Sequence, residues 1–120
     1  MHFARCQWSE EARNGLAQTF NDEESFIANG VQSGEMELFR VDGDSWAVVQ
    51  TWSDTQMCWC YQGRNALGFA QAMLRIAKRN NLRCIRFFTK HRALVRLLKS
   101  LNPVQVEPQI YEVGVQYNGQ

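Results

Sequence analysis

The sequence has little proline and no long hydrophobic run. Its 120 residues contain two prolines, Pro103 and Pro108, both late in the chain, and no repeat or low-complexity tract divides it. This length matches one domain, so we expect a single domain over residues 1–120. No apolar stretch approaches the 18 or so residues of a membrane-spanning helix, and no charged-then-apolar leader opens the chain. These absences predict a protein without a membrane span.

Cysteine is too sparse for a disulfide framework in a domain of this size. Cys58 and Cys60 stand two apart in an apolar run, so on a strand they would share a face and would be poorly placed to bridge each other. No second cysteine or histidine pair has the spacing of a zinc site, so we expect no metal. Free and mostly buried thiols suit a reducing compartment, and the cytoplasm is the simplest location.

Acidic residues are absent between Asp54 and Glu107. Residues 1–60 carry a net charge of −7 and residues 61–120 a net charge of +8, although the whole chain carries only +1. This asymmetry indicates an anionic partner or ligand. Alternatively, the basic side chains only form the solvent-exposed faces of the helices. Because no nucleic-acid motif accompanies the basic half, we expect at most weak, salt-sensitive and non-specific nucleic-acid binding.

Two short helices are expected before the strands begin. Ser9 precedes two glutamates and predicts the N-cap of a helix that runs to about Phe20. Residues 22–28 predict a second helix, stopped by Asn29 and Gly30.

The remaining chain alternates between strand and helix patterns. Residues 42–45 (Asp-Gly-Asp-Ser) predict a hairpin turn, and Leu94, Leu97, Leu98 and Leu101 predict the buried stripe of the last helix. We expect strands at 37–41, 46–52, 57–61, 84–88, 104–106 and 110–115, and helices at 64–80 and 91–101. The fold class is therefore α+β. We expect a mixed sheet in which an antiparallel meander is followed by a βαβ unit and a C-terminal hairpin, with helices on both faces.

The loop between the third strand and the next helix carries a family resemblance. Residues 65–70 (Asn-Ala-Leu-Gly-Phe-Ala) match the pattern Gln/Arg-x-x-Gly-x-Gly/Ala at Gly68 and Ala70, with Asn65 where Gln or Arg is usual. With the order of elements, this segment resembles the GNAT superfamily of acyl-CoA-dependent N-acetyltransferases over about residues 35–115. Residues 88–103 are similar to a second stretch of that family, in which Leu98 stands at the place of the usual tyrosine acid.

The resemblance implies acetyl-CoA as cofactor and an amine as acyl acceptor. A glycine-containing loop that opens a helix presents free N–H groups and a positive dipole end to a pyrophosphate, and Arg64 is within reach of a phosphate. The alternative is that Gly68 only permits close packing. The cofactor-binding candidates are Gln62, Gly63, Arg64, Asn65, Ala66 and Gly68.

Catalysis of this type needs a base for the amine and an acid for the leaving thiolate. Leu98 has no proton to donate, so Tyr61 is the candidate acid. Glu37 is the candidate base, acting through water, with Asp54 as an alternative.

A non-catalytic reading stands beside the enzyme. The chain also resembles small GNAT-like proteins of short-tailed phages, one of them classed with internal virion proteins. That likeness implies a virion or assembly component that works through protein or nucleic-acid contacts. Four tryptophans bear on the choice, and three of them fall in the meander. Packing in the sheet is their first explanation, but an exposed tryptophan would favour a surface for a partner.

Overall fold

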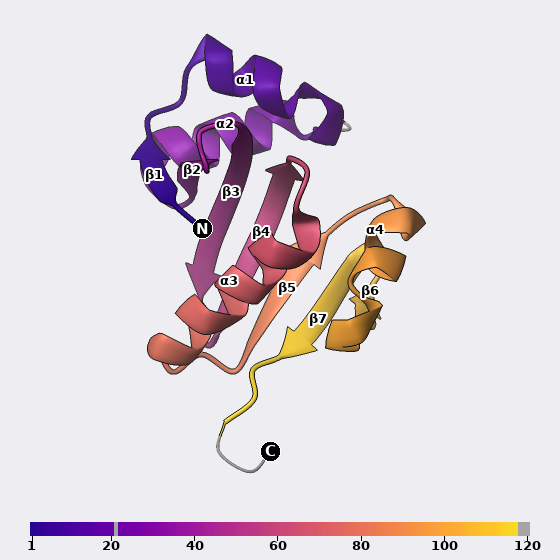
Figure 1. Cartoon of the computed structure of the whole chain (residues 1–120). Helices are drawn as coiled ribbons and strands as arrows, with labels where there is room; N and C mark the ends of the chain where they lie inside the picture. Colours follow the sequence, from indigo (N-terminus) through magenta and orange to yellow (C-terminus); the bar gives the residue numbers. More distant parts are fainter. Residues whose placement is uncertain (21, 118–120) are drawn as a thin grey trace. The chain divides into compact units, whose positions relative to one another are not determined.

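The computed structural model describes residues 1–20 and 22–117. Within this part of the chain there are seven strands, four α-helices and two short 3-10 turns (Figure 1). The strands are β1 (Phe3–Cys6), β2 (Glu37–Val41), β3 (Ser45–Trp52), β4 (Thr55–Gln62), β5 (Cys84–Phe88), β6 (Val104–Glu107) and β7 (Ile110–Gly114). The helices are α1 (Glu10–Leu16), α2 (Glu24–Ser33), α3 (Ala66–Arg79) and α4 (Arg92–Leu97), and the 3-10 turns are Ala17–Thr19 and Lys99–Leu101.

The chain separates into two compact units. Unit 1 comprises Met1–Gln50 and Cys58–Arg64, and unit 2 comprises Thr51–Met57 and Asn65–Gln120. The boundary therefore falls inside β3, inside β4 and between Arg64 and Asn65. One domain over residues 1–120 stays a prediction.

The seven strands form a mixed sheet in the order β1-β2-β3-β4-β5-β7-β6. In unit 1, β1 pairs with β2 and β2 pairs with β3, both antiparallel. In unit 2, β7 lies between β5 and β6 and is antiparallel to both. The predicted α+β class with a mixed sheet is confirmed.

The first strand, β1, was not predicted from the sequence. Phe3 of β1 lies opposite Val41 of β2, and the backbone N–H of His2 donates to the Asp42 carboxylate at 2.7 Å. β1 is only four residues long, and three of them are only half-buried. So short a segment shows no clear alternation, and its place in the sheet comes from pairing with a distant strand.

The two N-terminal helices differ in how well they were predicted. Ser9 caps α1 as expected, because its hydroxyl accepts from the Ala12 N–H at 3.1 Å. The predicted stop at Asn29 and Gly30 is wrong, since α2 continues to Ser33. Gly30 is instead a packing glycine, where a Cβ would meet the Met36 side chain. The helix ends at Gly34, whose φ of 87° is the left-handed conformation typical of a helix C-terminus.

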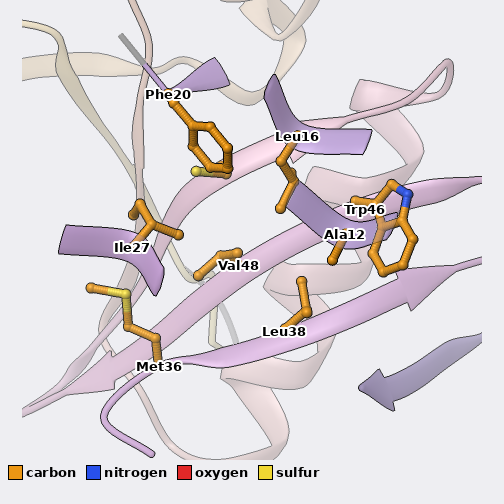
Figure 2. Close-up of a cluster of buried hydrophobic side chains, with 9 residues drawn as sticks. Ala12, Leu16, Phe20, Ile27, Met36, Leu38, Trp46 and Val48 are labelled. Atoms are coloured by element: carbon orange, nitrogen blue, oxygen red, sulfur yellow. The ribbon is translucent and has the colours of Figure 1, made fainter. Parts of the chain in front are cut away.

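The core of unit 1 is built by both helices and by strands β2 to β4. Figure 2 shows these side chains converging from helix and strand: Ala12, Leu16, Phe20, Ile27, Met36, Leu38, Trp46 and Val48. Leu16 and Leu38 are completely buried. Complete burial of one such side chain contributes about 1.5–3 kcal/mol to the free energy of unfolding.

Unit 2 is organised around α3, which packs on β5. Phe69, Met73 and Ala77 form the buried face of this helix. The predicted stripe on α4 is partly wrong. Leu98 is buried, but Leu97 is 64% exposed, because α4 ends at Leu97 and the tighter 3-10 turn that follows changes the face.

Candidate functional site

The start of α3 combines a side-chain cap with free backbone donors. Asn65 is the N-cap residue, and its Oδ1 accepts a hydrogen bond from the Gly68 N–H at 3.0 Å. Within the described residues, the N–H groups of Ala66 and Leu67 meet no acceptor. The first turn of the helix holds no acidic residue. Two donors therefore remain at the positive end of a 14-residue helix, which is the arrangement that binds anions.

The glycine before this helix is tightly packed. In unit 1, a Cβ built on Gly63 would collide with the Ser45 hydroxyl and would come within 2.7 Å of the Tyr61 hydroxyl. Ser45 is buried, and its hydroxyl donates to the Asp44 carboxylate at 2.9 Å. Gly63 therefore has a packing reason for lacking a side chain, independent of any ligand.

The predicted cofactor residues follow one another along the chain on both sides of the unit boundary. Gln62, Gly63 and Arg64 close unit 1, at and just after the end of β4. Asn65, Ala66 and Gly68 open unit 2 at the start of α3. Gly68 is held close to Asn65, whose amide a Cβ on Gly68 would strike. Their role in cofactor binding stays a prediction.

The two predicted catalytic residues lie at different ends of unit 1. The Tyr61 hydroxyl lies near Gly63 and Ser45, and Ser45 pairs with Val41 at the end of β2. Glu37 begins β2, four positions away, or about 13 Å along the strand. Its carboxylate lies 3.5 Å from the Arg5 guanidinium. The structure thus does not bring Tyr61 and Glu37 together.

Two other residues of the catalytic argument have clear structural roles. Leu98, at the place of the usual tyrosine acid, is 3% exposed and serves the core. Asp54 accepts a hydrogen bond from Arg83 Nε at 3.0 Å, and this contact together with the Thr55 hydroxyl lowers the pKa of the Asp54 carboxyl. A carboxylate with a lowered pKa is a weaker base.

A cavity of about 140 Å³ lies in unit 1 between the α1–α2 segment and β4. Its walls are Thr19, Phe20, Glu23, Phe26, Ile27, Trp59 and Cys60. The rings of Phe26 and Trp59 meet edge to face with centroids 5.1 Å apart. Trp59 is fixed by a 3.0 Å hydrogen bond from its Nε1 to Gln50. The lining residues are scattered from 19 to 60, so no local sequence pattern predicts this cavity.

Glu23 gives the cavity its charge. Glu23 is half-buried, and no salt bridge joins its carboxylate to a cation among the residues that the structure describes. Burial raises the pKa of the Cys60 thiol to about 11; the Thr19 hydroxyl lowers this pKa and the Glu23 charge raises it further. At neutral pH the Cys60 thiol is therefore protonated.

Cys58 is the other buried thiol of β4. Burial raises the pKa of Cys58 well above its usual range, and its thiol donates to the Cys60 carbonyl at 3.4 Å. No group of three metal-ligating side chains is found in the described ranges.

A second hollow of about 650 Å³ is more open and is bordered by β1, α2 and β2. Among the residues described, no helix has both the length and the apolar character needed to span a bilayer.

The chain is similar to known proteins in structure, but its sequence matches no known family. No protein-family model matches the sequence, and no curated protein sequence matches it. The ribosomal-protein-S18-alanine N-acetyltransferase of Escherichia coli aligns with a TM-score of 0.62 at 12% identity, covering 99% of this chain and 97% of that one.

Two further structures give the same result. A putative GNAT-family acetyltransferase of Desulfovibrio desulfuricans aligns with a TM-score of 0.61 at 14% identity, covering 96% of this chain and 99% of that one. A Bacillus subtilis acetyltransferase in complex with CoA aligns with a TM-score of 0.56 at 12% identity, covering 97% and 98%. At such low sequence identity the alignments show the fold alone. All three show the same one: the chain has the fold of the GNAT acetyltransferase superfamily.

Proposed function

We propose that the chain is an acyl-CoA-dependent N-acyltransferase with acetyl-CoA as cofactor. The observation that carries this proposal is the pair of unpartnered N–H groups of Ala66 and Leu67 at the start of α3. They suit a pyrophosphate because the dipole of α3 adds positive charge at the same place. Gln62, Gly63 and Arg64 precede them in the chain, and the Arg64 guanidinium supplies a formal positive charge for a phosphate.

The fit is incomplete at one point, which shapes the expected affinity. The Gly68 N–H, a third donor of this turn, already donates to Asn65. An anion at the helix end therefore receives two backbone hydrogen bonds, unless Asn65 turns away. We expect this cap to weaken phosphate binding compared with a turn whose three donors are all free.

The 140 Å³ cavity suits the acceptor amine. A cavity of about 150 Å³ accommodates a benzene-sized molecule, so about six heavy atoms of the acceptor fit here. The Glu23 carboxylate attracts an ammonium group, and the faces of Phe26 and Trp59 favour the same cation. The apolar walls favour the neutral amine once it is inside, because burial lowers the pKa of an ammonium.

The thioester supplies an activated acyl group, so that an N–C bond forms as the C–S bond breaks. The chain's own task is to move a proton from the amine to the departing thiolate. Tyr61 is the proposed acid. Its phenol hydroxyl can donate a proton, and the residue lies near the end of β4, just before the proposed cofactor loop. Glu37, whose carboxylate also pairs with Arg5, is the proposed base and acts through water.

Thermal unfolding with and without acetyl-CoA tests the cofactor site. A ligand at 100 times its Kd raises the free energy of unfolding by about 2.7 kcal/mol, so the unfolding temperature rises clearly. Ala66→Pro removes one proposed donor at the first position of α3, where proline is well tolerated. Glu10→Pro makes the same change at the first position of α1 and is the matched control.

We expect acetyl-CoA to raise the unfolding temperature less in Ala66→Pro than in the unaltered chain, and to raise it as before in Glu10→Pro. If millimolar acetyl-CoA does not raise the unfolding temperature of the unaltered chain, the cofactor assignment is overturned.

For the acceptor, Glu23→Gln should raise KM for small primary amines, and the exposed Glu35→Gln should leave this KM unchanged. Tyr61→Phe should lower kcat with little change in KM.

A second candidate function is a non-catalytic protein of the same fold, such as a phage virion or assembly component. One observation favours it: Trp52 is 74% exposed, as a tryptophan in a partner-binding surface would be. The two functions place the protein differently, in the cytoplasm or in a virion. Co-purification with virus particles in a producing host would decide between these locations.

A further inference from the structure

Three aromatic rings line the 140 Å³ cavity of unit 1. They belong to Phe20, Phe26 and Trp59. The rings of Phe26 and Trp59 meet at an interplanar angle of 80°, with their centroids 5.1 Å apart. Rings that stand at right angles form two separate walls instead of one stack. Phe20 comes from the core cluster of the unit (Figure 2) and adds a third wall.

The protein holds these walls in place before any ligand binds. Phe20 is 5% exposed, and its ring also meets that of Trp8, with centroids 6.1 Å apart. Trp59 Nε1 donates to Gln50 Oε1 at 3.0 Å. Phe26 is 51% exposed, so the cavity is reachable from the solvent beside this ring. A ligand therefore enters a site that is already formed, which lowers the entropy cost of binding.

The cavity wall carries one carboxylate, that of Glu23. The guanidinium of Arg13 in α1 pairs with Glu24, at 2.6 Å, and no salt bridge of the described part of the chain reaches Glu23. Among the described residues that line the cavity, none is basic. The cavity therefore combines a carboxylate with aromatic rings, and both attract a cation.

The hydrogen-bond acceptors of the cavity indicate which kind of cation fits. A primary ammonium has three N–H donors, and each needs an acceptor when it leaves water. Apart from Glu23, the lining side chains with an oxygen or sulfur atom are Thr19 and Cys60. The Thr19 hydroxyl donates to the Leu16 carbonyl at 2.8 Å, and the Cys60 thiol is a weak acceptor. A trimethylammonium group has no N–H, so its entry leaves no donor without an acceptor.

We propose that this cavity binds a trimethylammonium group. The group and the carbon that carries it comprise about five heavy atoms, which fit a cavity of benzene size. Its methyl groups lie against the three rings, as quaternary ammonium groups do in aromatic cages, and the Glu23 carboxylate balances its charge. The binding goes beyond acyl transfer, because this nitrogen has no proton to exchange for an acyl group. On the proposed function, such a ligand excludes the acceptor amine from the cavity.

Two sources present this group: a small molecule such as choline, and a trimethylated lysine in another protein. The full chain is therefore titrated, without acetyl-CoA, with choline and with a short peptide that contains trimethyl-lysine. Tighter binding of the peptide identifies a methylated protein as the source. Choline that binds at least as tightly as the peptide identifies a small molecule. Either result supports the proposal.

Three ligands with the same skeleton separate the contributions to binding. Choline carries the trimethylammonium group, ethanolamine carries a primary ammonium in its place, and the tert-butyl analogue of choline has the same shape without the charge. We expect choline to bind about tenfold more tightly than the neutral analogue, because the charge adds attraction to the rings and to the carboxylate. Ethanolamine should bind more weakly than choline, since its N–H donors leave water without enough acceptors.

Two variants of the cavity have matched controls. Glu23→Gln should weaken choline binding about fivefold and leave the neutral analogue unchanged. Phe26→Leu keeps an apolar side chain but removes a ring, and should weaken choline binding about threefold. Glu35→Gln removes an exposed carboxylate elsewhere in unit 1, and should leave the Kd unchanged. Phe3→Leu should also leave it unchanged, because Phe3 meets Phe39 edge to face outside the cavity.

NMR titration of the full chain measures each Kd and locates the ligand. The indole N–H signal that disappears in Trp59→Phe identifies Trp59, and Trp52→Phe identifies Trp52 in the same way. Choline should shift the Trp59 signal and leave the signal of Trp52, an exposed indole of unit 2, in place.

Four outcomes overturn the proposal: no binding of either choline or the peptide at millimolar concentration, equal Kd values for choline and its neutral analogue, tighter binding of ethanolamine than of choline, or equal Kd values for Glu23→Gln and Glu35→Gln. The comparison of ligands on the unaltered chain holds even if a variant fails to fold, which thermal unfolding checks. None of these outcomes changes the expected stabilisation by acetyl-CoA, so this proposal and the proposed function fail separately.

Discussion

The Asn65 side chain and the Gly68 backbone are joined by a hydrogen bond of 3.0 Å, from the Gly68 N–H to Oδ1 of Asn65. The bond stabilises α3 by capping it, and it occupies one backbone donor at the N-terminal end of the same helix, where we propose that a phosphate binds. A single contact thus connects the stability of the helix with the affinity of the proposed cofactor site.

We expect Asn65→Ala to lower the free energy of unfolding by about 1 kcal/mol, the usual cost of losing an N-cap side chain. Urea unfolding measures this change. The same variant releases the Gly68 N–H, so acetyl-CoA should bind at least as tightly as before. Ser9→Ala is the control, because it removes the cap of α1 at a similar cost and should leave acetyl-CoA binding unchanged. Loss of binding in Asn65→Ala alone would mean that the Asn65 side chain itself contacts the ligand.

Gly63 is predicted to tolerate no side chain. Gly63→Ala places a methyl group against the buried Ser45 side chain and the Tyr61 hydroxyl, and such overpacking costs about 1–3 kcal/mol. The backbone itself is not the obstacle, since Gly63 is not among the glycines with positive φ. Urea unfolding of Gly63→Ala is compared with that of Gly114→Ala, where the added Cβ meets nothing within 4 Å. Only Gly63→Ala should lose stability through a steric clash.

A second substitution tests the contact directly. Ser45→Gly removes the side chain that the new methyl group would strike, so the double variant should recover part of the loss. A positive coupling between the two positions in this double-mutant cycle is the expected result. Additive effects would show that Gly63 is intolerant for another reason.

The sequence predicted most elements because their signals are local. The N-cap of α1 at Ser9 and the hairpin turn at 42–45 each depend on a few adjacent residues, and each was found. The errors concern distant partners. β1 depends on its pairing with β2, and the role of Gly30 inside α2 depends on Met36.

The candidate site divides in the same way. The proposed cofactor segment 62–68 is continuous, so a motif resembling that of a known family was sufficient to predict it. The cavity around Glu23, Phe26 and Trp59 joins three elements and has no such pattern. Trp52 was counted with the packing tryptophans, because spacing alone does not say which end of a strand leaves the core.

Glu112 is expected to make the stability of unit 2 sensitive to acid. It accepts from Arg83 Nη1 at 3.1 Å and from Arg86 Nε at 2.9 Å, with its side chain 20% exposed. Burial acts to raise the pKa of Glu112, but the hydrogen bonds from Arg83 and Arg86 outweigh it, so this pKa is lowered from its ordinary 4.5. A lowered pKa in the folded state means that the stabilisation is present above pH 4.5 and is lost as the pH falls through the folded value.

Glu112→Gln removes this charge and should cost about 1–2 kcal/mol at pH 7, the range for hydrogen bonds to a charged group that is partly screened by solvent. Urea unfolding at pH 7 and at pH 3 measures the difference between the two chains. The difference should shrink at pH 3, where Glu112 in the unaltered chain takes up a proton. The lowered pKa of Asp54 acts in both chains alike and cancels in the comparison. Glu35→Gln, at an exposed position without an ion pair among the described residues, should show no pH-dependent difference. A constant difference for Glu112→Gln from pH 7 to pH 3 would contradict the coupling of Glu112 to Arg83 and Arg86.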